Sequence, residues 1–290
     1  MTKVPDKVAL YRLERFDPKI LENLPSDVSG YAMAIGGMPR NHSEVFTKRG
    51  WLLPYLFVYD ELLNGGRWLY WLDILEKGTI AGSGPIPQIH WTDIWSPQAQ
   101  AAKSMLDTCL QHHEATIDNF ADWLLWGLGG STVCPNISEG LNEHFYRIFD
   151  LFLVLDNPTD YLSNVLVDQT GRGYHQGLGY YPTPFNICRF MVEILHGAGE
   201  REEMKRQTVN DPCVGCGAML LPASNYFLRA YASDISGIAV KLCTIQMFFY
   251  APWYAKPGQV LGFDETARPI ELVLAKPGKK VAPGQLEFVL

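Results

Sequence analysis

One short segment of the 290-residue chain constrains its fold more than any other. The segment Asp211-Pro212-Cys213-Val214-Gly215-Cys216-Gly217 follows the β-like run Thr208–Asp211 and precedes a run, 217–228, that is predicted to be helical. Glycines let a backbone approach a ligand closely, and the start of a helix offers free N–H donors. The segment therefore predicts a ligand-binding turn at the carboxyl end of a strand.

An acidic residue follows at the end of the next predicted strand, which covers 230–234. This residue, Asp234, comes seventeen positions after Gly217. A carboxylate at such a place can accept hydrogen bonds from ribose hydroxyls, as in the dinucleotide-binding folds of doubly wound sheets. The turn and the carboxylate together indicate a ligand that contains a nucleoside.

The segment of residues 90–168 is predicted to be mainly helical. Ser96-Pro97 is typical of a helix start, with a capping hydroxyl followed by proline in the first turn. The spacing of apolar residues predicts one helix from there to Gly127 and another that begins at Ser138. A further short helix is expected over Tyr161–Val167.

Beyond Gly171, short β-like runs alternate with helical ones, which is typical of a parallel α/β sheet. Thr183-Pro184 is predicted to cap a helix with one apolar face directed inward. That face consists of Ile187, Phe190, Met191, Ile194 and Leu195.

Three more strands are expected, over Gln259–Leu261, 270–275 and 286–290. Ten residues separate the last two, fewer than a parallel crossover needs, so the last strand is expected to be antiparallel. The predicted fold is α/β, with a mainly helical domain over 1–168 and a truncated Rossmann-like domain over 169–290. Its sheet would have about five strands and an open edge, which favours binding of a second copy or a partner protein.

The net charge of −7 is unevenly distributed. Residues 51–165 carry four basic and fourteen acidic side chains, a net charge of −10. Such a segment lacks the clustered positive charge with which proteins bind the phosphates of nucleic acids. DNA binding by the isolated chain is therefore predicted to be weak.

The sequence gives no sign of a membrane or secretory segment. Residues 1–20 alternate charged and apolar side chains without a secretory apolar core, and no long apolar window is free of polar breaks. We therefore expect a cytoplasmic protein that makes no membrane contact.

No metal centre is predicted. Cys213 and Cys216 have ligand-like spacing, but no second pair completes a tetrahedral zinc site, and the thiols are expected to be reduced. His112 and His113 have only Glu114 beside them, and His113 falls on an apolar helical face that is typical of a core histidine.

The segment Gly177–Pro184, the turn 211–217 and Asp234 together resemble the N-6 adenine DNA methyltransferase family, as in modification subunits of type I restriction systems. That family carries G-x-[YF]-[YF]-T-P, then a strand ending in D-P-x-x-G-x-G, then an acidic residue after the second strand. Pro182 departs from this spacing by one residue. The resemblance spans roughly 160–278 and implies a class I S-adenosylmethionine fold that acts in DNA methylation.

The resemblance also implies which residues bind the cofactor S-adenosylmethionine. Tyr180, Tyr181 and Thr183 would border its methionine end, and Asp234 would hold the ribose. The full set of predicted cofactor-binding residues is Tyr180, Tyr181, Thr183, Pro184, Asp211, Pro212, Gly215, Cys216, Gly217, Asp234 and Ile235.

The catalytic motif of this family, [DNS]-P-P-[YF], has no intact counterpart here. Lys276-Pro277-Gly278 occupies the matching position after the predicted strand 270–275. Protonated lysine has donors only, and glycine supplies no ring to stack on an extruded base. The tetrapeptide Ala251-Pro252-Trp253-Tyr254 comes too early and is predicted to be a loop.

Three functions remain open at this point. The chain could be a DNA adenine methyltransferase, a non-catalytic binding or assembly module of the same fold, or a methyltransferase for RNA or protein. Lys276 and the short remainder of the chain favour impaired catalysis.

Overall fold

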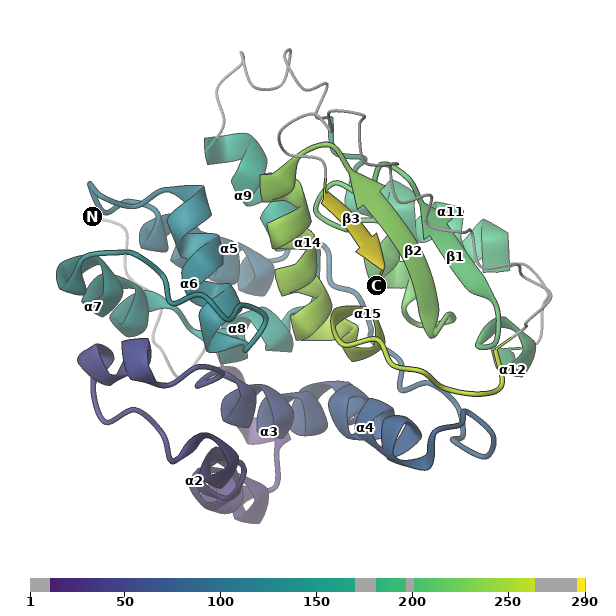
Figure 1. The fold of residues 1–290 in the computed structure, drawn as a ribbon, viewed down its shortest axis with the longest axis horizontal. Coiled ribbons are helices and arrows are strands. Elements are labelled where there is room, and N and C mark those ends of the chain that lie inside the picture. Colours follow the sequence, from purple (N-terminus) through teal and green to yellow (C-terminus); the bar gives the residue numbers. More distant parts are fainter. Residues whose placement is uncertain (1–10, 170–180, 197–200, 264–285, 290) are drawn as a thin grey trace, which may run out of the picture. The chain divides into compact units, whose positions relative to one another are not determined.

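A computed structural model describes residues 11–169, 181–196, 201–263 and 286–289. Contacts divide the chain into two compact units, and each is assembled from two stretches of sequence. The first unit is Met1–Gly66 with His90–Tyr161, and the second is Arg67–Ile89 with Leu162–Leu290. Helices predominate in the described residues, and all three strands belong to the second unit (Figure 1).

The described residues of the first unit form helices joined by short loops. These are η1 (Leu13–Arg15), α2 (Pro18–Ala32), η2 (Met33–Ile35), η3 (His42–Thr47), α3 (Leu53–Asn64), α5 (Pro97–Cys109), α6 (Ile117–Gly127), α7 (Glu139–Ile148) and α8 (Leu151–Asp156). Throughout the described chain, every helix is too short or too polar to traverse a bilayer.

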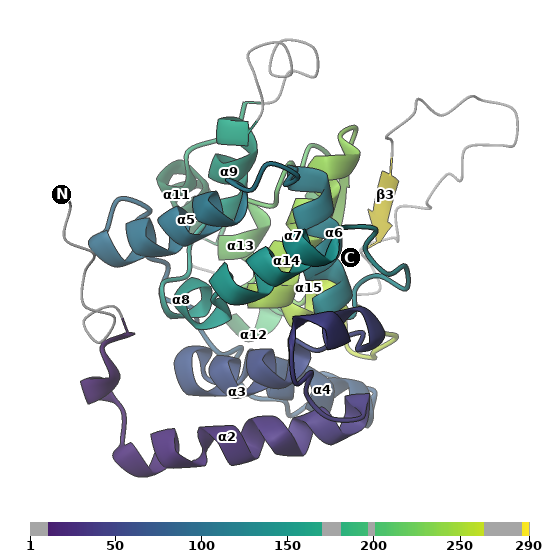
Figure 2. The same ribbon diagram turned by 90° about the vertical axis from the view of Figure 1, so that its left-hand side faces the viewer.

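Aromatic side chains fill the core of the first unit, and α2 lies alongside α3 (Figure 2). Trp123 is fully buried between Phe120 and Phe145, and its indole N–H donates to Oδ1 of Asn142 at 2.9 Å. The Asn142 amide in turn donates to the carbonyl of His42 at 2.6 Å. The buried indole of Trp123 and the buried amide of Asn142 are therefore both paired, as is usual for buried polar groups.

The single helix predicted from Pro97 to Gly127 is wrong, because the chain breaks into α5 and α6. Thr116 and Asn119 form a reciprocal capping box that begins α6, and this local bonding outcompetes a continuous helix. The start of the helix predicted from Ser138 is confirmed, with Ser138 as the cap of α7, but its predicted continuation through Leu155 is wrong. α7 ends at Ile148, because a new cap begins α8.

The second unit combines further helices with a small sheet. Its elements are α4 (Arg67–Lys77), α9 (Tyr161–Gln169), α11 (Phe185–His196), α12 (Arg201–Met204), β1 (Thr208–Asp211), α13 (Leu220–Ala223), β2 (Arg229–Asp234), α14 (Gly237–Tyr250), α15 (Pro252–Ala255) and β3 (Leu286–Val289).

The sheet has the order β1-β2-β3 (Figure 1). β1 and β2 are parallel, with Asp211 opposite Ala232, and β3 runs antiparallel to β2. The parallel pair and the antiparallel direction of β3 confirm the sequence analysis. Within the described residues β1 pairs with β2 alone, so a partner chain at that edge stays a prediction.

Two predicted elements of this unit are wrong. Gln259–Leu261 joins no sheet, because Leu261 makes a single bridge to Thr79. The helix expected over 217–228 is reduced to α13, four residues long, and the chain turns again at Ser224. The strand expected over 270–275 lies outside the described residues.

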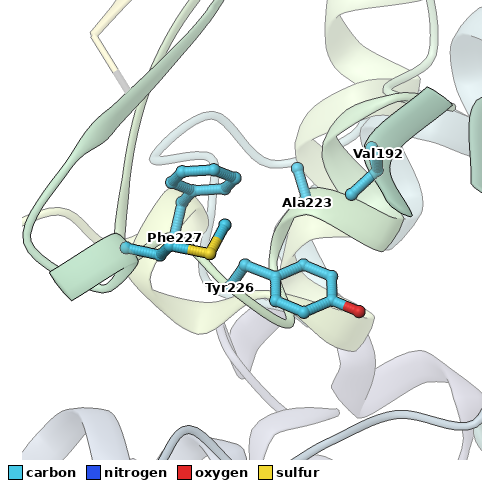
Figure 3. Packing of buried hydrophobic residues seen from close by; sticks show 5 residues of the cluster. Val192, Ala223, Tyr226 and Phe227 are labelled. Carbon is cyan, nitrogen blue, oxygen red and sulfur yellow. The ribbon is translucent and has the colours of Figure 1, made fainter. Parts of the chain in front are cut away.

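Helix α11 forms where it was predicted, but its buried side was predicted wrongly. Val192 packs with Met204, Ala223, Tyr226 and Phe227 in a cluster that joins α11 to α13 (Figure 3). The residues expected to face inward are all exposed, with exposed fractions of 43–67%: Ile187, Phe190, Met191, Ile194 and Leu195. α11 also carries apolar residues outside that stripe. Contacts with α13 bury Val192, and the wider stripe stays exposed.

Residues 67–89 pack with the second unit, although the predicted helical domain contained them. Arg67 is fully buried, with its guanidinium 4.4 Å from the ring centroid of Trp253. It donates to Oδ1 of Asn225 at 2.8 Å and to the carbonyl of Ser224 at 2.9 Å. The Asn225 side-chain amide also accepts from the Ile89 N–H and donates to the Ile89 carbonyl, so one amide fixes both ends of the segment.

We expect Asn225→Ala to lower the free energy of unfolding by about 2–4 kcal/mol, because it leaves buried donors and an acceptor without partners. Urea denaturation followed by circular dichroism measures the change. Asn136→Ala, which truncates an exposed asparagine, is the matched control and should alter stability by less than about 0.5 kcal/mol. Equal stability of the two variants would contradict the role of Asn225.

Candidate functional site: a cavity at the ends of β1 and β2

The candidate site lies where two parallel strands end. β1 ends at Asp211 and β2 ends at Asp234, and parallel pairing places both carboxyl ends at the same edge of the sheet. This edge is where open α/β sheets bind their ligands. The two carboxylates predicted from the sequence are therefore brought to one location.

Asp234 is held by two backbone N–H groups. Oδ2 accepts from Gly215 at 2.8 Å, and Oδ1 accepts from Ser236 at 2.8 Å. Each carboxylate oxygen has a second lone pair, so Asp234 can still accept hydrogen bonds from a ligand. The two N–H groups fix the direction in which those lone pairs point.

The glycine turn packs tightly against α14. Gly217 has φ +95°, and a Cβ on it would lie 2.8 Å from Cε of Met247 and 3.0 Å from Sγ of Cys243. Any other residue would be strained there and would collide with the helix. Nε2 of Gln246 donates to the carbonyl of Cys216 at 2.7 Å and ties the turn to the same helix.

A cavity of about 370 Å³ lies over this turn. It is lined by apolar side chains, backbone and two carboxylates, and its size suits a small organic ligand. The lining residues are Ser163, Tyr181, Pro182, Thr183, Cys188, Asp211, Pro212, Cys213, Val214, Gly215, Cys216, Ala218, Met219, Asp234, Ile235 and Ser236.

Most of the predicted cofactor-binding residues meet in this cavity. Tyr181 and Ile235 lie at its exposed margin, with exposed fractions of 74% and 59%. Two predicted residues, Pro184 and Gly217, do not line it, although Gly217 supports the turn from below. Tyr180 lies outside the described residues.

The predicted cofactor-binding set omitted eight of the lining residues, which are Ser163, Pro182, Cys188, Cys213, Val214, Ala218, Met219 and Ser236. Ser163 comes from α9, and no local pattern marks it. Cys188 lies on the first turn of α11, with its Sγ 3.6 Å from the carbonyl of Thr183, so helical spacing from the Thr183-Pro184 cap could have indicated it. Met219 follows Gly217 by two positions in a stretch that was expected to be a regular helix.

Burial raises the pKa of the Asp211 carboxyl, and the nearby charge of Asp234 raises it further. The N–H of Cys213, which donates to Oδ1 of Asp211 at 3.1 Å, acts in the opposite direction. The two acidic side chains make the cavity favourable for a ligand that carries positive charge.

No disulfide joins the two cysteines of the turn. Cys216 is buried, as expected of a small side chain that fills space, whereas Cys213 is exposed. The predicted catalytic positions Lys276 and Pro277 lie outside the described residues.

The tetrapeptide at 251–254 is not the predicted loop. Pro252–Ala255 forms the short helix α15, and both of its aromatic side chains are buried. The Tyr254 hydroxyl donates to the carbonyl of Phe227 at 2.8 Å, so neither Trp253 nor Tyr254 presents a ring for stacking on a base.

Parallel strands, a glycine turn and an oriented carboxylate are an arrangement typical of folds that bind nucleoside-containing ligands. Residues 164–251 match the family model described as N-6 DNA Methylase, so the chain contains an N-6 DNA methylase domain over these residues. The match confirms the resemblance, and it spans every described lining residue except Ser163. Proteins of this family use S-adenosylmethionine.

Neither the curated proteins nor the solved structures yielded a match to this chain. The family match is therefore the finding that connects the cavity to a known chemistry.

We expect Asp211→Asn to raise the stability of the fold at neutral pH. The folded-state pKa of Asp211 is raised, so its ionised form costs stability above that pKa, and the cost disappears as pH falls through it. The amide oxygen can still accept from Cys213. Denaturation of both proteins from neutral pH to about pH 4 should show the difference narrowing.

Asp73→Asn is the control for this experiment, because Asp73 is an exposed aspartate in the same unit, paired with Lys77 at 2.6 Å. An Asp211→Asn protein less stable than the parent at neutral pH would contradict the argument.

Proposed function

We propose that the cavity over the turn 211–217 binds S-adenosylmethionine, and that the chain is a DNA adenine methyltransferase-like protein with impaired catalysis. The observation that carries the proposal is the meeting of Asp234, the glycine turn and Tyr181 in one cavity. The N-6 DNA methylase match over 164–251 supports it independently.

The residues of the cavity fit this cofactor. Asp234 retains lone pairs for the ribose hydroxyls, and the segment Tyr181–Thr183 would border the methionine end. The acidic pair of Asp211 and Asp234 suits a ligand whose sulfonium and ammonium groups are cationic. The cofactor supplies a methyl group on positively charged sulfur, and the chain's own residues orient and enclose it.

Asp234→Ala should weaken binding of S-adenosylmethionine by about 1–3 kcal/mol, or roughly 5- to 150-fold, because the ribose hydroxyls lose their hydrogen-bond acceptor. Isothermal titration of the full chain measures this, with binding by the parent expected in the micromolar to sub-millimolar range.

Asp73→Ala removes an exposed carboxylate from the same unit and should leave the affinity unchanged. Binding that is indifferent to Asp234 would remove this assignment, and absence of binding by the parent would remove the cofactor proposal itself.

The proposal of impaired catalysis depends on the sequence at Lys276-Pro277-Gly278. Methyl transfer to an exocyclic amine needs an acceptor that polarises the nitrogen and a surface that holds the extruded base. Lysine supplies donors only, and its charge opposes the positive charge that develops on the attacking nitrogen. The burial of Trp253 and Tyr254 removes the other candidate for stacking.

Adenine methylation by this chain should therefore be undetectable or very slow. Loss of one oriented hydrogen-bond partner in a transition state costs about 2.7–4 kcal/mol, or on the order of a hundred- to a thousandfold in rate. Transfer of radiolabelled methyl groups to duplex and single-stranded DNA measures it, beside a competent adenine methyltransferase as positive control.

Lys276→Asn alone should not restore transfer, because Gly278 still offers no ring. Multiple turnovers within minutes would overturn the impairment. Methylation of RNA or protein in parallel reactions would instead favour a different substrate, and cofactor binding with no transfer to any of these would favour a binding or assembly module.

A further inference from the structure

The turn between α5 and α6 gathers three potential metal ligands outside the cofactor cavity. His112, His113 and Glu114 each offer a ligand atom, and these atoms all lie within 4.8 Å of one another. His113 is exposed and lies on this turn, so its prediction as a core histidine is wrong. We propose that these three side chains bind a divalent transition-metal ion such as Zn²⁺.

The geometry requires little rearrangement. Nδ1 of His112 lies 4.0 Å from Oε2 of Glu114, and its lone pair accepts a long hydrogen bond of 3.3 Å from the Glu114 N–H, which a bound metal ion would displace. Zinc bonds of about 2.0–2.2 Å in tetrahedral geometry place ligand atoms roughly 3.3–3.5 Å apart. Because His113 and Glu114 are exposed, side-chain rotations can close the difference.

Neighbouring groups already orient two of the ligands. The Ser138 hydroxyl donates to Oε2 of Glu114 and also caps α7 by accepting from the N–H of Leu141 at 3.1 Å. The ring of His144 lies 5.0 Å from that of His112, centroid to centroid. Outer groups that fix the direction of a ligand are a regular part of metal sites.

His144 is itself positioned by the end of α5. Its Nε2 lies 3.1 Å from the carbonyl oxygens of both Thr108 and Cys109. Nε2 therefore donates, and Nδ1 remains an acceptor on the neutral ring.

The electrostatic surroundings favour a cation. The turn follows the C-terminus of α5, the negative end of its dipole. Residues 51–165, which include this turn, carry a net charge of −10. Two imidazoles with one carboxylate select zinc-like ions over magnesium and calcium, which prefer oxygen ligands throughout.

The test is isothermal titration of the full, chelator-stripped chain with ZnCl₂, and with MgCl₂ for comparison. We expect saturable zinc binding that the double variant H112N/H113N weakens at least tenfold, with no binding of magnesium. His90→Asn, which changes an exposed histidine elsewhere in the same unit, should leave zinc affinity unaltered.

Thiols could also bind zinc, since Cys134 and Cys213 are exposed. Zinc affinity unchanged in H112N/H113N, or lost equally in His90→Asn, would therefore overturn the proposal, as would absence of zinc binding by the parent. Circular dichroism checks that each variant folds. If the double variant does not fold, the same titration of Glu114→Gln tests the site. Weaker zinc binding by this variant supports the proposal, and unchanged binding overturns it.

Discussion

The rest of the candidate site depends on the two hydrogen bonds that the carboxylate of Asp234 accepts. By accepting N–H groups from Gly215 and Ser236, the carboxylate joins the turn after β1 to the end of β2. Ser236 is also the cap of α14, with Oγ accepting from Ala239 at 3.3 Å, so the same few residues fix where that helix begins. Hydrogen bonds to an ionised acceptor are stronger than neutral ones, which explains how such a short turn holds its shape.

Helix α14 provides the support for this turn. One part of its surface contacts Gly217 so closely that only glycine fits, and Gln246 bonds to the turn's backbone. Another part of its surface contacts α4, and there the indole N–H of Trp68 donates to the carbonyl of Phe248 at 3.0 Å. Ten of the fourteen residues of α14 are buried, and the segment 67–89 contributes to the unit that contains the cavity.

Helix α11 shows a different constraint. Val192 and Cys188 are buried, yet a broad apolar stripe on the same helix is exposed, including Phe190 and Leu195 at 62% and 67%. The regular spacing of that stripe marks an apolar face, but periodicity alone does not show which apolar residues pack against the rest of the fold. The exposed stripe belongs to the surface of the described second unit.

The sequence by itself determined the local features of this protein. Strands β1 and β2, the capped starts of α5 and α7, the position of α11 and the acidic residue at the end of β2 all follow from short-range patterns whose physics is local. The same patterns indicated eight of the sixteen residues that line the cavity, because a parallel strand pair brings its two carboxyl ends together.

Only the tertiary structure decided the rest. Ser163 reaches the cavity from α9, Asn225 ties residues 67–89 to the second unit, and His113 turns outward because Thr116 caps a new helix. Each outcome depends on contacts between residues far apart in the chain, or on competition between two locally acceptable structures. Local propensity predicts neither the long-range contacts nor the outcome of such a competition. The free energy that separates the alternatives comes from packing and from pairing of buried polar groups.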